Sequence, residues 1–352
     1  MIALTGTEYP IIQAPMAGVS TPALAAAVSN AGGLGSLGIG ASSLAQARAM
    51  ILQARSLTNR PINVNVFCHA PARRNEVVET AWIRHLSPLF AELGAQVPGQ
   101  LNEIYQSFLT DEEAFHMLLE VKPAVVSFHF GIPAADKITA FKAAGMTTLA
   151  TATNLEEALA IQNAGIDGII AQGIEAGGHR GMFDPAETDE RLGTLDLLRQ
   201  LVRHINRPII AAGGIMDGGG VMAALDLGAV AVQLGTAFIL CPETAADTAY
   251  RHTLKTARSG QTRLTSVISG RPARGIVNRL IEHGEASISP PPADYPVAYD
   301  LAKQLHEEAT KIGNSGFAAH WAGQGAPFAR ELPAAQLMQV LVDELTAARC
   351  EH

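Results

Sequence analysis

The chain has 352 residues, 48% of them hydrophobic, so its core can exceed that of one α/β barrel of about 250 residues. The net charge is −8 without a Lys/Arg run, which argues against a nucleic-acid or membrane surface and favours a small-molecule partner. Cys68, Cys241 and Cys350 lie far apart without a C-x-x-C pair, and the N-terminus has no signal-type segment, so we expect a cytoplasmic protein that is neither disulfide-bonded nor membrane-anchored.

Short apolar runs of β type alternate with helical patterns along the first two thirds of the chain. Thr21-Pro22 and Asn154 are typical helix starts, and Gly32 and Gly165 are typical helix ends. Further helices are predicted over 195–205 and 220–227. The eight predicted strands cover 10–15, 33–39, 62–67, 124–130, 147–153, 168–173, 208–213 and 229–238.

Alternation of strands and helices predicts an α/β fold with a parallel sheet, and eight units favour a TIM (β/α)8 barrel over an open doubly wound sheet. The polar residues that interrupt the strands also favour the barrel, because they fall at the carboxyl ends, which converge on one mouth. These interruptions include Gln13, Asn65, His129, Gln172 and Gln233.

Two segments exceed the short connections of a barrel. Residues 68–123 follow the third strand and contain helical patterns at 76–93 and 111–121; residues 241–332 contain predicted helices at 242–256 and 297–312, with 260–284 read as irregular. We expect 1–240 to form the barrel and 241–332 a mainly helical substrate-side region, to which the long insertion could add. Residues 333–352 should form a helix that packs back on the barrel.

The stretch 169–181 is the strongest candidate for chemistry. A buried-type strand ends there in Gln172 and a glycine-rich loop that includes Gly177 and carries His179. Glycines let a loop backbone approach a ligand, and a histidine can exchange protons near neutral pH without a large pKa shift. A surface turn with a solvated histidine is the alternative, but the grouping of Gln, Glu and His favours a site.

The last two predicted strands end in Gly213-Gly214 and in Gln233-Leu234-Gly235-Thr236. In barrels this position commonly holds a phosphate through loop amides and a helix N-terminus, which residues 216–220 could begin. Tight turns are the alternative. Across the mouth, Met16 could be ordinary core, and Asn65 could either bond a ring or ribityl oxygen or cap a turn.

Tyr295, Tyr299 and Lys303 recur every four residues, so on a helix they would share one face. Two phenols and an ammonium group suit an anionic ligand such as a carboxylate. A solvated helix face is the usual alternative, but two of only five tyrosines fall here.

Several motifs together resemble the nitronate monooxygenases, formerly called 2-nitropropane dioxygenases, and in particular the class I enzymes of bacteria and fungi. The resemblance runs over essentially the whole chain. It rests on Q-A-P-M-A-G-V-S-T-P, N-V-N-V-F-C-H, S-F-H-F-G, A-Q-G-I-E-A-G-G-H-R-G, A-A-G-G-I-M-D-G-G-G, A-V-Q-L-G-T-A-F, D-Y-P-V-A-Y-D-L-A-K and H-W-A-G-Q-G.

The resemblance implies an FMN-containing TIM barrel that oxidises alkyl nitronates with O₂, propionate 3-nitronate being favoured, to a carbonyl compound plus nitrite or nitrate, as detoxification. His179 matches the active-site histidine, a base toward neutral nitroalkanes. Cofactor-binding residues would be Met16, Asn65, Gln172, Gly177, Gly213, Gly214, Gln233, Leu234, Gly235 and Thr236. Substrate-binding residues would be Tyr105, His129, Tyr295, Tyr299 and Lys303. No metal is implied, and a monomer or homodimer is expected.

The main alternative is an FMN-dependent NAD(P)H:quinone or enoyl-acyl-carrier-protein reductase on a related barrel. It would need a nicotinamide site, and the sequence has no second dinucleotide fingerprint. A colourless isomerase or aldolase barrel is a third possibility, but no lysine near a strand end is an evident Schiff-base candidate.

Overall fold

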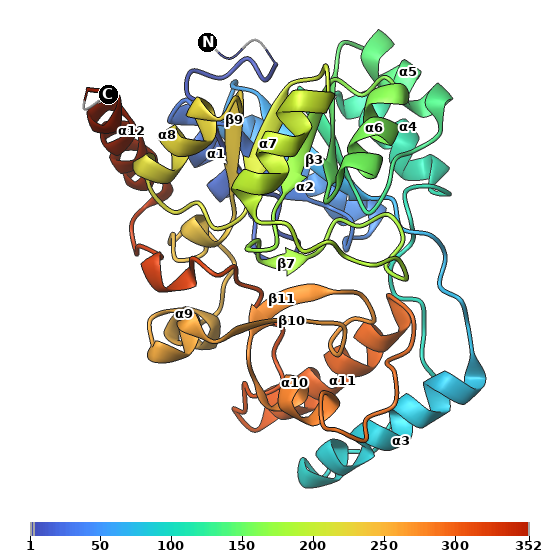
Figure 1. Ribbon diagram of the computed structural model, residues 1–352. Helices are drawn as coiled ribbons and strands as arrows, with labels where there is room; N and C mark the ends of the chain where they lie inside the picture. The colour runs from blue at the N-terminus through green and yellow to red at the C-terminus, as the bar shows by residue number, and fades with distance from the viewer. Residues whose placement is uncertain (1, 3, 351–352) are drawn as a thin grey trace.

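A parallel eight-stranded sheet forms the centre of the computed structural model, which describes residues 2 and 4–350 (Figure 1). A parallel bridge between Ile12 and Leu34 joins β1 to the start of β2, with backbone hydrogen bonds of 2.9 Å on either side, so the sheet nearly closes into a barrel. The predicted TIM barrel is confirmed. Its strands are β1 (Ile11–Gln13), β2 (Gly35–Gly38), β3 (Ile62–Phe67), β4 (Val125–His129), β5 (Thr147–Ala152), β6 (Gly168–Gln172), β8 (Ile209–Ala212) and β9 (Ala231–Leu234).

Helices surround the sheet, and their caps follow the sequence. The Thr21 hydroxyl accepts a hydrogen bond from the amide of Leu24, and the Asn154 side chain accepts one from Glu157. At Gly35 a Cβ would lie 1.9 Å from the carbonyl oxygen of Ala25, so only glycine lets α1 pack this closely on β2. The outer helices are α1 (Pro22–Asn30), α2 (Leu44–Leu57), α4 (Glu112–Val121), α5 (Ala135–Ala143), α6 (Leu155–Asn163), α7 (Thr194–His204), α8 (Gly218–Asp226) and α12 (Ala334–Cys350).

The barrel strands are apolar on both faces because both faces are covered. Ile12, Leu149, Ile170 and Ile210 fill the interior of the barrel. Neighbouring strand residues point outward and pack against the helices. This double burial explains why the strands appear in the sequence as continuous apolar runs.

A second, three-stranded antiparallel sheet lies below the barrel mouth in Figure 1. It consists of β10 (Thr262–Thr265), β11 (Ala273–Ile276) and the two-residue β7 (Gly178–His179), which belongs to the loop after β6. The prediction that 260–284 is irregular was therefore wrong, since this segment holds β10, β11 and α10 (Arg279–Gly284). Its strands are short, and β11 pairs both with β10, which is near in sequence, and with β7, which lies much earlier in the chain.

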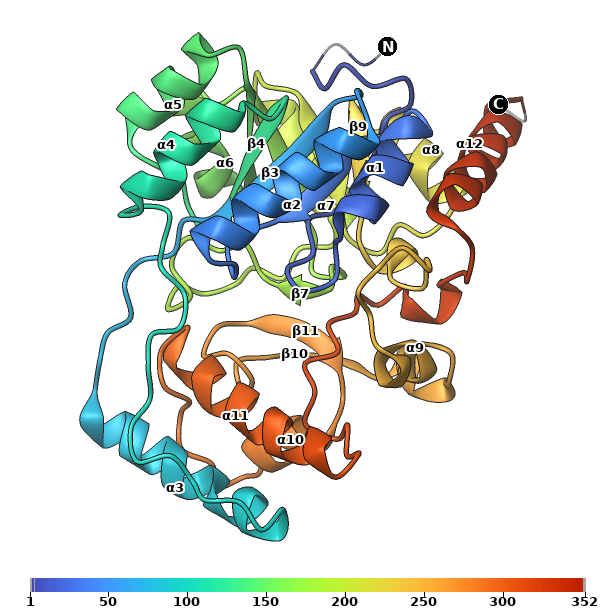
Figure 2. The ribbon, with the colours of Figure 1, turned by 180° about the vertical axis from the view of Figure 1, so that it is seen from behind.

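Helices from two distant parts of the chain pack beneath this small sheet. α3 (Glu76–Glu92), from the long connection after β3, lies beside α10 and α11 (Val297–Lys311) in both ribbon views (Figure 2). The buried side chains that join them are Trp82, Leu86, Leu280, Leu301 and Leu305.

The helix predicted over 242–256 was too long. Only α9 (Thr248–Leu254) is helical there, because Asp247 caps it and the Arg251 guanidinium bonds the carbonyl oxygens of Leu240 and Cys241 in the preceding turns. The strand predicted over 229–238 likewise ends at Leu234 and continues as the short helix η1 (Thr236–Phe238). Two further short helices are η2 (Ala257–Gly260) and η3 (Ala326–Phe328).

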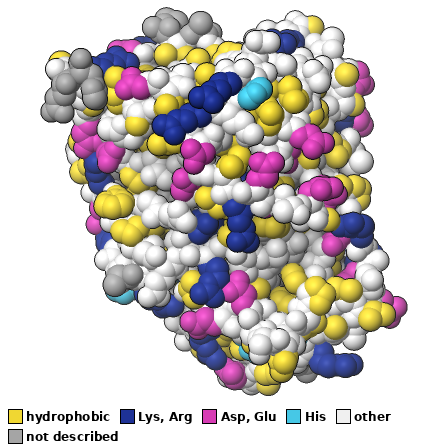
Figure 3. Space-filling model, in the orientation of Figure 1, with side chains coloured by type: hydrophobic (Ala, Val, Ile, Leu, Met, Phe, Trp, Pro, Cys, Tyr) yellow, Lys and Arg dark blue, Asp and Glu magenta, His cyan; other side chains and the backbone are white. Residues whose placement is uncertain are grey.

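Acidic and basic side chains are interspersed over the face of the molecule seen in Figure 3. None of the helices among the described residues is both long and apolar enough to cross a membrane.

Candidate functional site

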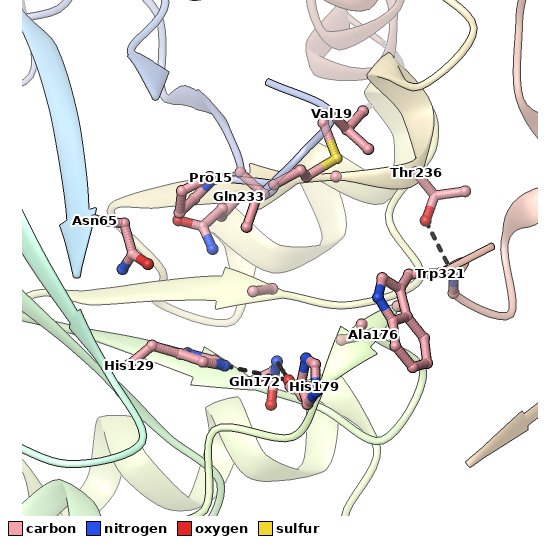
Figure 4. Close-up of a pocket in the computed structure, with 18 of the residues that line it drawn as sticks. Pro15, Val19, Asn65, His129, Gln172, Ala176, His179, Gln233, Thr236 and Trp321 are labelled. Atoms are coloured by element: carbon pink, nitrogen blue, oxygen red, sulfur yellow. Dashed lines mark hydrogen bonds between the residues drawn. The ribbon is translucent and has the colours of Figure 1, made fainter. Parts of the chain in front are cut away.

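A cavity of about 410 Å³ opens at the carboxyl ends of the barrel strands, between the barrel and the small sheet (Figure 4). All sixteen residues predicted as site residues contribute to its wall, so the structure brings them together, while their individual roles stay predictions. They are Met16, Asn65, Tyr105, His129, Gln172, Gly177, His179, Gly213, Gly214, Gln233, Leu234, Gly235, Thr236, Tyr295, Tyr299 and Lys303.

One end of the cavity is lined by glycine backbone. Gly213 and Gly214 have φ angles of 128° and 70°, a region that favours glycine. A Cβ on Gly177 would lie 2.5 Å from the amide nitrogen of Gly323, and this amide donates to the Thr236 hydroxyl at 3.0 Å. The strand-end glycines and the C-terminal segment around Gly323 therefore form a narrow wall that exposes main-chain atoms.

The start of α8 does not take part in this wall, contrary to the suggestion that residues 216–220 could supply a phosphate-binding helix. The helix begins there, but the Gly218 amide donates to the Glu344 carboxylate at 2.9 Å and the Gly220 amide donates to Asp217 at 2.8 Å. Of this segment only Met216 reaches the cavity.

Two amide side chains near the centre keep an acceptor for a ligand. Asn65 donates through Nδ2 to the carbonyl oxygen and hydroxyl of Ser127, which leaves its Oδ1 available. The Oε1 of Gln233 is buried without a hydrogen-bond partner among the described residues. A buried acceptor without a partner is costly, so this oxygen points to a donor on a ligand.

His179 is held by its backbone as well as its ring. Its carbonyl oxygen accepts one hydrogen bond from His129 Nε2 at 3.2 Å and another from Gln172 Nε2 at 3.0 Å (Figure 4). Gln172 also accepts from the Gly181 amide through Oε1 at 2.8 Å. Both side chains thus fix the loop that carries His179, in addition to lining the cavity.

The hydrogen bonds determine the tautomers of the two histidines. Because a carbonyl oxygen only accepts, His129 carries its proton on Nε2, and its Nδ1 accepts from the Thr151 hydroxyl at 3.1 Å. The Ser269 hydroxyl donates to the carbonyl oxygen of Arg271 at 3.1 Å, so His179 donates its Nε2 proton to Ser269 at 2.9 Å. His179 Nδ1 then retains its lone pair.

The expectation that His179 titrates near neutral pH was wrong. Burial lowers the pKa of His179 to about 3, and the neighbouring His129, Arg271 and His69 lower it further. Burial likewise lowers the pKa of His129 to about 4. Both imidazoles are therefore neutral at physiological pH.

Tyrosines and a lysine line the other end of the cavity. The Lys303 Nζ lies 5.0 Å from the ring centroid of Tyr105 and 5.6 Å from that of Tyr299. Burial raises the pKa of Tyr105 and of Tyr299 to about 12, so both phenols stay protonated and can donate to an anion. Tyr295 precedes α11 by two residues, which corrects the expectation of a single helical face, yet it faces the same cavity.

Sequence reasoning missed several aromatic residues of the wall. Trp321 packs 5.2 Å from the His179 ring and donates through Nε1 to the Tyr299 hydroxyl at 3.4 Å. Phe130 stands edge to face with His179 at 5.6 Å. Both residues belong to motifs that support the family resemblance, H-W-A-G-Q-G and S-F-H-F-G. Nothing in these motifs indicated that the two side chains line the cavity. Phe67 and Tyr250 complete this group.

The chain matches the family model described as "Nitronate monooxygenase" over residues 1–344. It is 55% identical to a nitronate monooxygenase of Pseudomonas aeruginosa over 342 residues, covering 97% of each chain. It is 54% identical to one of Paraburkholderia phytofirmans, covering 98% of this chain and 94% of the relative. Among solved structures, a nitroalkane oxidase from Streptomyces ansochromogenes superposes with a TM-score of 0.92 at 39% identity, over 100% of this chain and 99% of the other.

Proposed function

The chain belongs to the nitronate monooxygenase family, and we propose that it is an FMN-dependent oxidoreductase that uses O₂ to convert small anionic alkyl nitronates to a carbonyl compound plus nitrite or nitrate. Propionate 3-nitronate is the substrate that we favour, and detoxification is the role. One observation carries the proposal: a single cavity joins a glycine-lined end to a phenol and ammonium end, with the neutral His179 between them.

The glycine-lined end fits the phosphate and ribityl chain of FMN. Gly214 and Gly235 present main-chain atoms to the cavity, against which a phosphate would lie, and Thr236 adds a hydroxyl. The unpartnered Oε1 of Gln233 and the Oδ1 of Asn65 would accept from the ring N–H or the ribityl hydroxyls. Bound FMN would supply the electron transfer from nitronate to O₂.

The protein's own residues would bind, orient and shield the substrate. Lys303 and the protonated phenols of Tyr105 and Tyr299 would hold the anion, and Trp321 and Phe130 would exclude water beside His179. A nitronate arrives already deprotonated. This matters because a base whose pKa lies near 3 removes a C–H proton poorly at neutral pH.

The first test is the cofactor. Purified protein should be yellow and release one FMN per chain on heating. Gly214→Ala should weaken FMN binding, since the added Cβ would lie 3.1 Å from that of Glu175 and the backbone of Gly214, which lines the cavity, would have to shift. Gly145→Ala is the matched control, because Gly145 has a similar φ of 83° with open space around it, outside the cavity wall. Release of FAD, or no flavin after reconstitution, would contradict the cofactor assignment.

The second test is the reaction. Oxygen consumption should follow addition of propionate 3-nitronate without a nicotinamide cofactor. NADH added anaerobically should leave the flavin absorbance unchanged. Rapid bleaching by NADH together with inactivity toward nitronates would instead indicate a reductase.

A further inference from the structure

Arg271 is buried without an acidic partner among the residues that the structure describes. Its side chain is 3% exposed, and it forms no salt bridge with any described residue. It donates to the main-chain carbonyl oxygens of Met182 and Phe183, while its Nε has no partner in the described part of the chain. Arg180, equally buried, shows the usual arrangement, with two hydrogen bonds of 2.9 Å to Asp189. Because burying an unpaired charge is costly, the charge of Arg271 calls for a functional reason.

The guanidinium lies one aromatic ring behind the cavity wall. Its Cζ is 4.3 Å from the ring centroid of Phe130, and that ring is 5.6 Å from the imidazole of His179. The positive charge is therefore at most about 10 Å from His179. The same turn carries Ser269, which bonds the His179 ring.

The groups that face Arg271 leave its charge largely uncompensated. His69, His129 and His179 are neutral, and Arg271 itself contributes to lowering the pKa of each. Burial raises the pKa of Tyr295 well above its usual value, so this phenol carries no charge either. Burial lowers the pKa of Arg271 to about 10, and the acidic groups Glu157 and Asp184 oppose this shift only in part. The Glu157 carboxylate already accepts from the Phe183 and Thr153 amides.

Lys303, the other cation at the cavity, has a different environment. It is solvent-exposed, so water and salt screen its charge. The charge of Arg271 is enclosed by protein, where screening by salt is weak.

We propose that Arg271 is a specificity-determining residue, whose buried charge acts through space to favour anionic nitronates over the corresponding neutral nitroalkanes. The proposal rests on the proposed function. A unit charge about 10 Å away at an effective dielectric constant of about 20 changes the affinity for an anion by roughly tenfold. This contribution should persist at high ionic strength, unlike that of Lys303.

The test compares an anion with its neutral parent in the flavin-containing enzyme. In the wild type, Arg271→Met and Arg271→Lys we would measure two dissociation constants. That of ethyl nitronate would come from the concentration dependence of the rate of anaerobic flavin reduction, and that of nitroethane from changes in flavin absorbance. The ratio of the two constants should fall roughly tenfold in Arg271→Met and change less than threefold in Arg271→Lys. Arg274→Met is the matched control, because Arg274 is also buried and donates to main-chain Ile174, but the nearby Glu175 carboxylate offsets its charge. Its ratio should fall clearly less than that of Arg271→Met.

An unchanged ratio in folded, flavin-loaded Arg271→Met would overturn the proposal, as would an equal fall in the Arg274→Met control. A second measurement does not depend on the folding of the Arg271 variants. In Lys303→Ala, the preference for ethyl nitronate over nitroethane should survive at about 0.5 M salt, where the Debye length is only about 4 Å. Loss of this preference at high salt would overturn the proposal. Failure of the wild type to bind flavin or to oxidise any nitronate would instead refute the proposed function.

Discussion

Replacing His69 by phenylalanine should make the protein more resistant to acid. His69 is fully buried, with its ring edge to face against Tyr295 at a centroid distance of 5.0 Å. Burial and the nearby Arg271 lower the pKa of His69 to about 4, against a weaker opposing contact with the Tyr105 backbone. In the unfolded chain the pKa of a histidine is about 6.5.

The sign follows from which state takes up the proton. Above pH ~6.5 the His69 ring is neutral in both states, so it has no effect on the pH dependence of stability. Between pH ~6.5 and about 4 mainly the unfolded chain is protonated, which lowers the free energy of unfolding by ~1.4 kcal/mol per pH unit. At pH 5 the loss attributable to His69 is therefore ~2 kcal/mol.

The measurement is denaturant unfolding of the wild type and His69→Phe at pH 7.5 and pH 5.0, with equal ionic strength and flavin saturation. The loss of free energy between the two pH values should be ~2 kcal/mol smaller in the variant. Any packing cost of the larger ring is the same at both pH values and cancels. Phe141→Leu, a core change without a titrating group, should leave the pH difference unaltered. Equal losses in the wild type and His69→Phe would refute the reasoning.

Three further predictions concern the cavity. Lys303→Ala should raise KM for propionate 3-nitronate and remove most of the salt dependence of this KM. If KM stayed unchanged and nitronates without a charged tail were equally good substrates, the assignment of Lys303 to the substrate pocket would be wrong. His179→Asn should retain FMN and lower kcat/KM for nitronates and for any nitroalkane that the wild type uses by similar factors, because a histidine with a pKa near 3 is a weak base and acts mainly by orienting the anion. A loss of roughly 10² to 10⁴-fold confined to nitroalkanes would instead identify His179 as a general base. Ser269→Ala, which removes the hydrogen-bond partner of His179 Nε2, should lower kcat/KM for propionate 3-nitronate by up to about tenfold at unchanged flavin content, and a wild-type value would speak against it.

The barrel was predictable because each of its strands is buried on two faces. Runs such as that of β6 are apolar throughout, and the polar residue at each carboxyl end, for example Gln172, shows where the run meets the mouth. The cavity residues could be collected for the same reason, since all carboxyl ends of a parallel barrel point one way.

The small sheet and the electrostatics were not predictable in this way. β7 has only two residues, and its pairing partner Ala273–Ile276 lies far along the chain. The sequence around β7 therefore has no alternating apolar pattern from which this strand pairing could be predicted. The low pKa of His179 follows from its burial and then from the nearby His129, Arg271 and His69, which come from separate segments of the chain. The ordinary pKa of a histidine therefore predicted titration near neutral pH, whereas the surroundings of His179 in the folded protein lower its pKa far below that range.

The position of His179 depends on both halves of the molecule at once. From the barrel, the side chains of His129 and Gln172 donate hydrogen bonds to the His179 carbonyl oxygen. From the C-terminal segment, Ala273 pairs with the His179 backbone, and the Ser269 hydroxyl accepts a hydrogen bond from the His179 ring. Rotation of the ring would break the bond to Ser269, and movement of the loop would break two bonds to buried donors. The imidazole is thus fixed as a neutral group with Nδ1 unprotonated, at the place where the glycine-lined and phenol-lined ends of the cavity meet. Such a group suits a site in which a preformed anion must be oriented more than a proton removed.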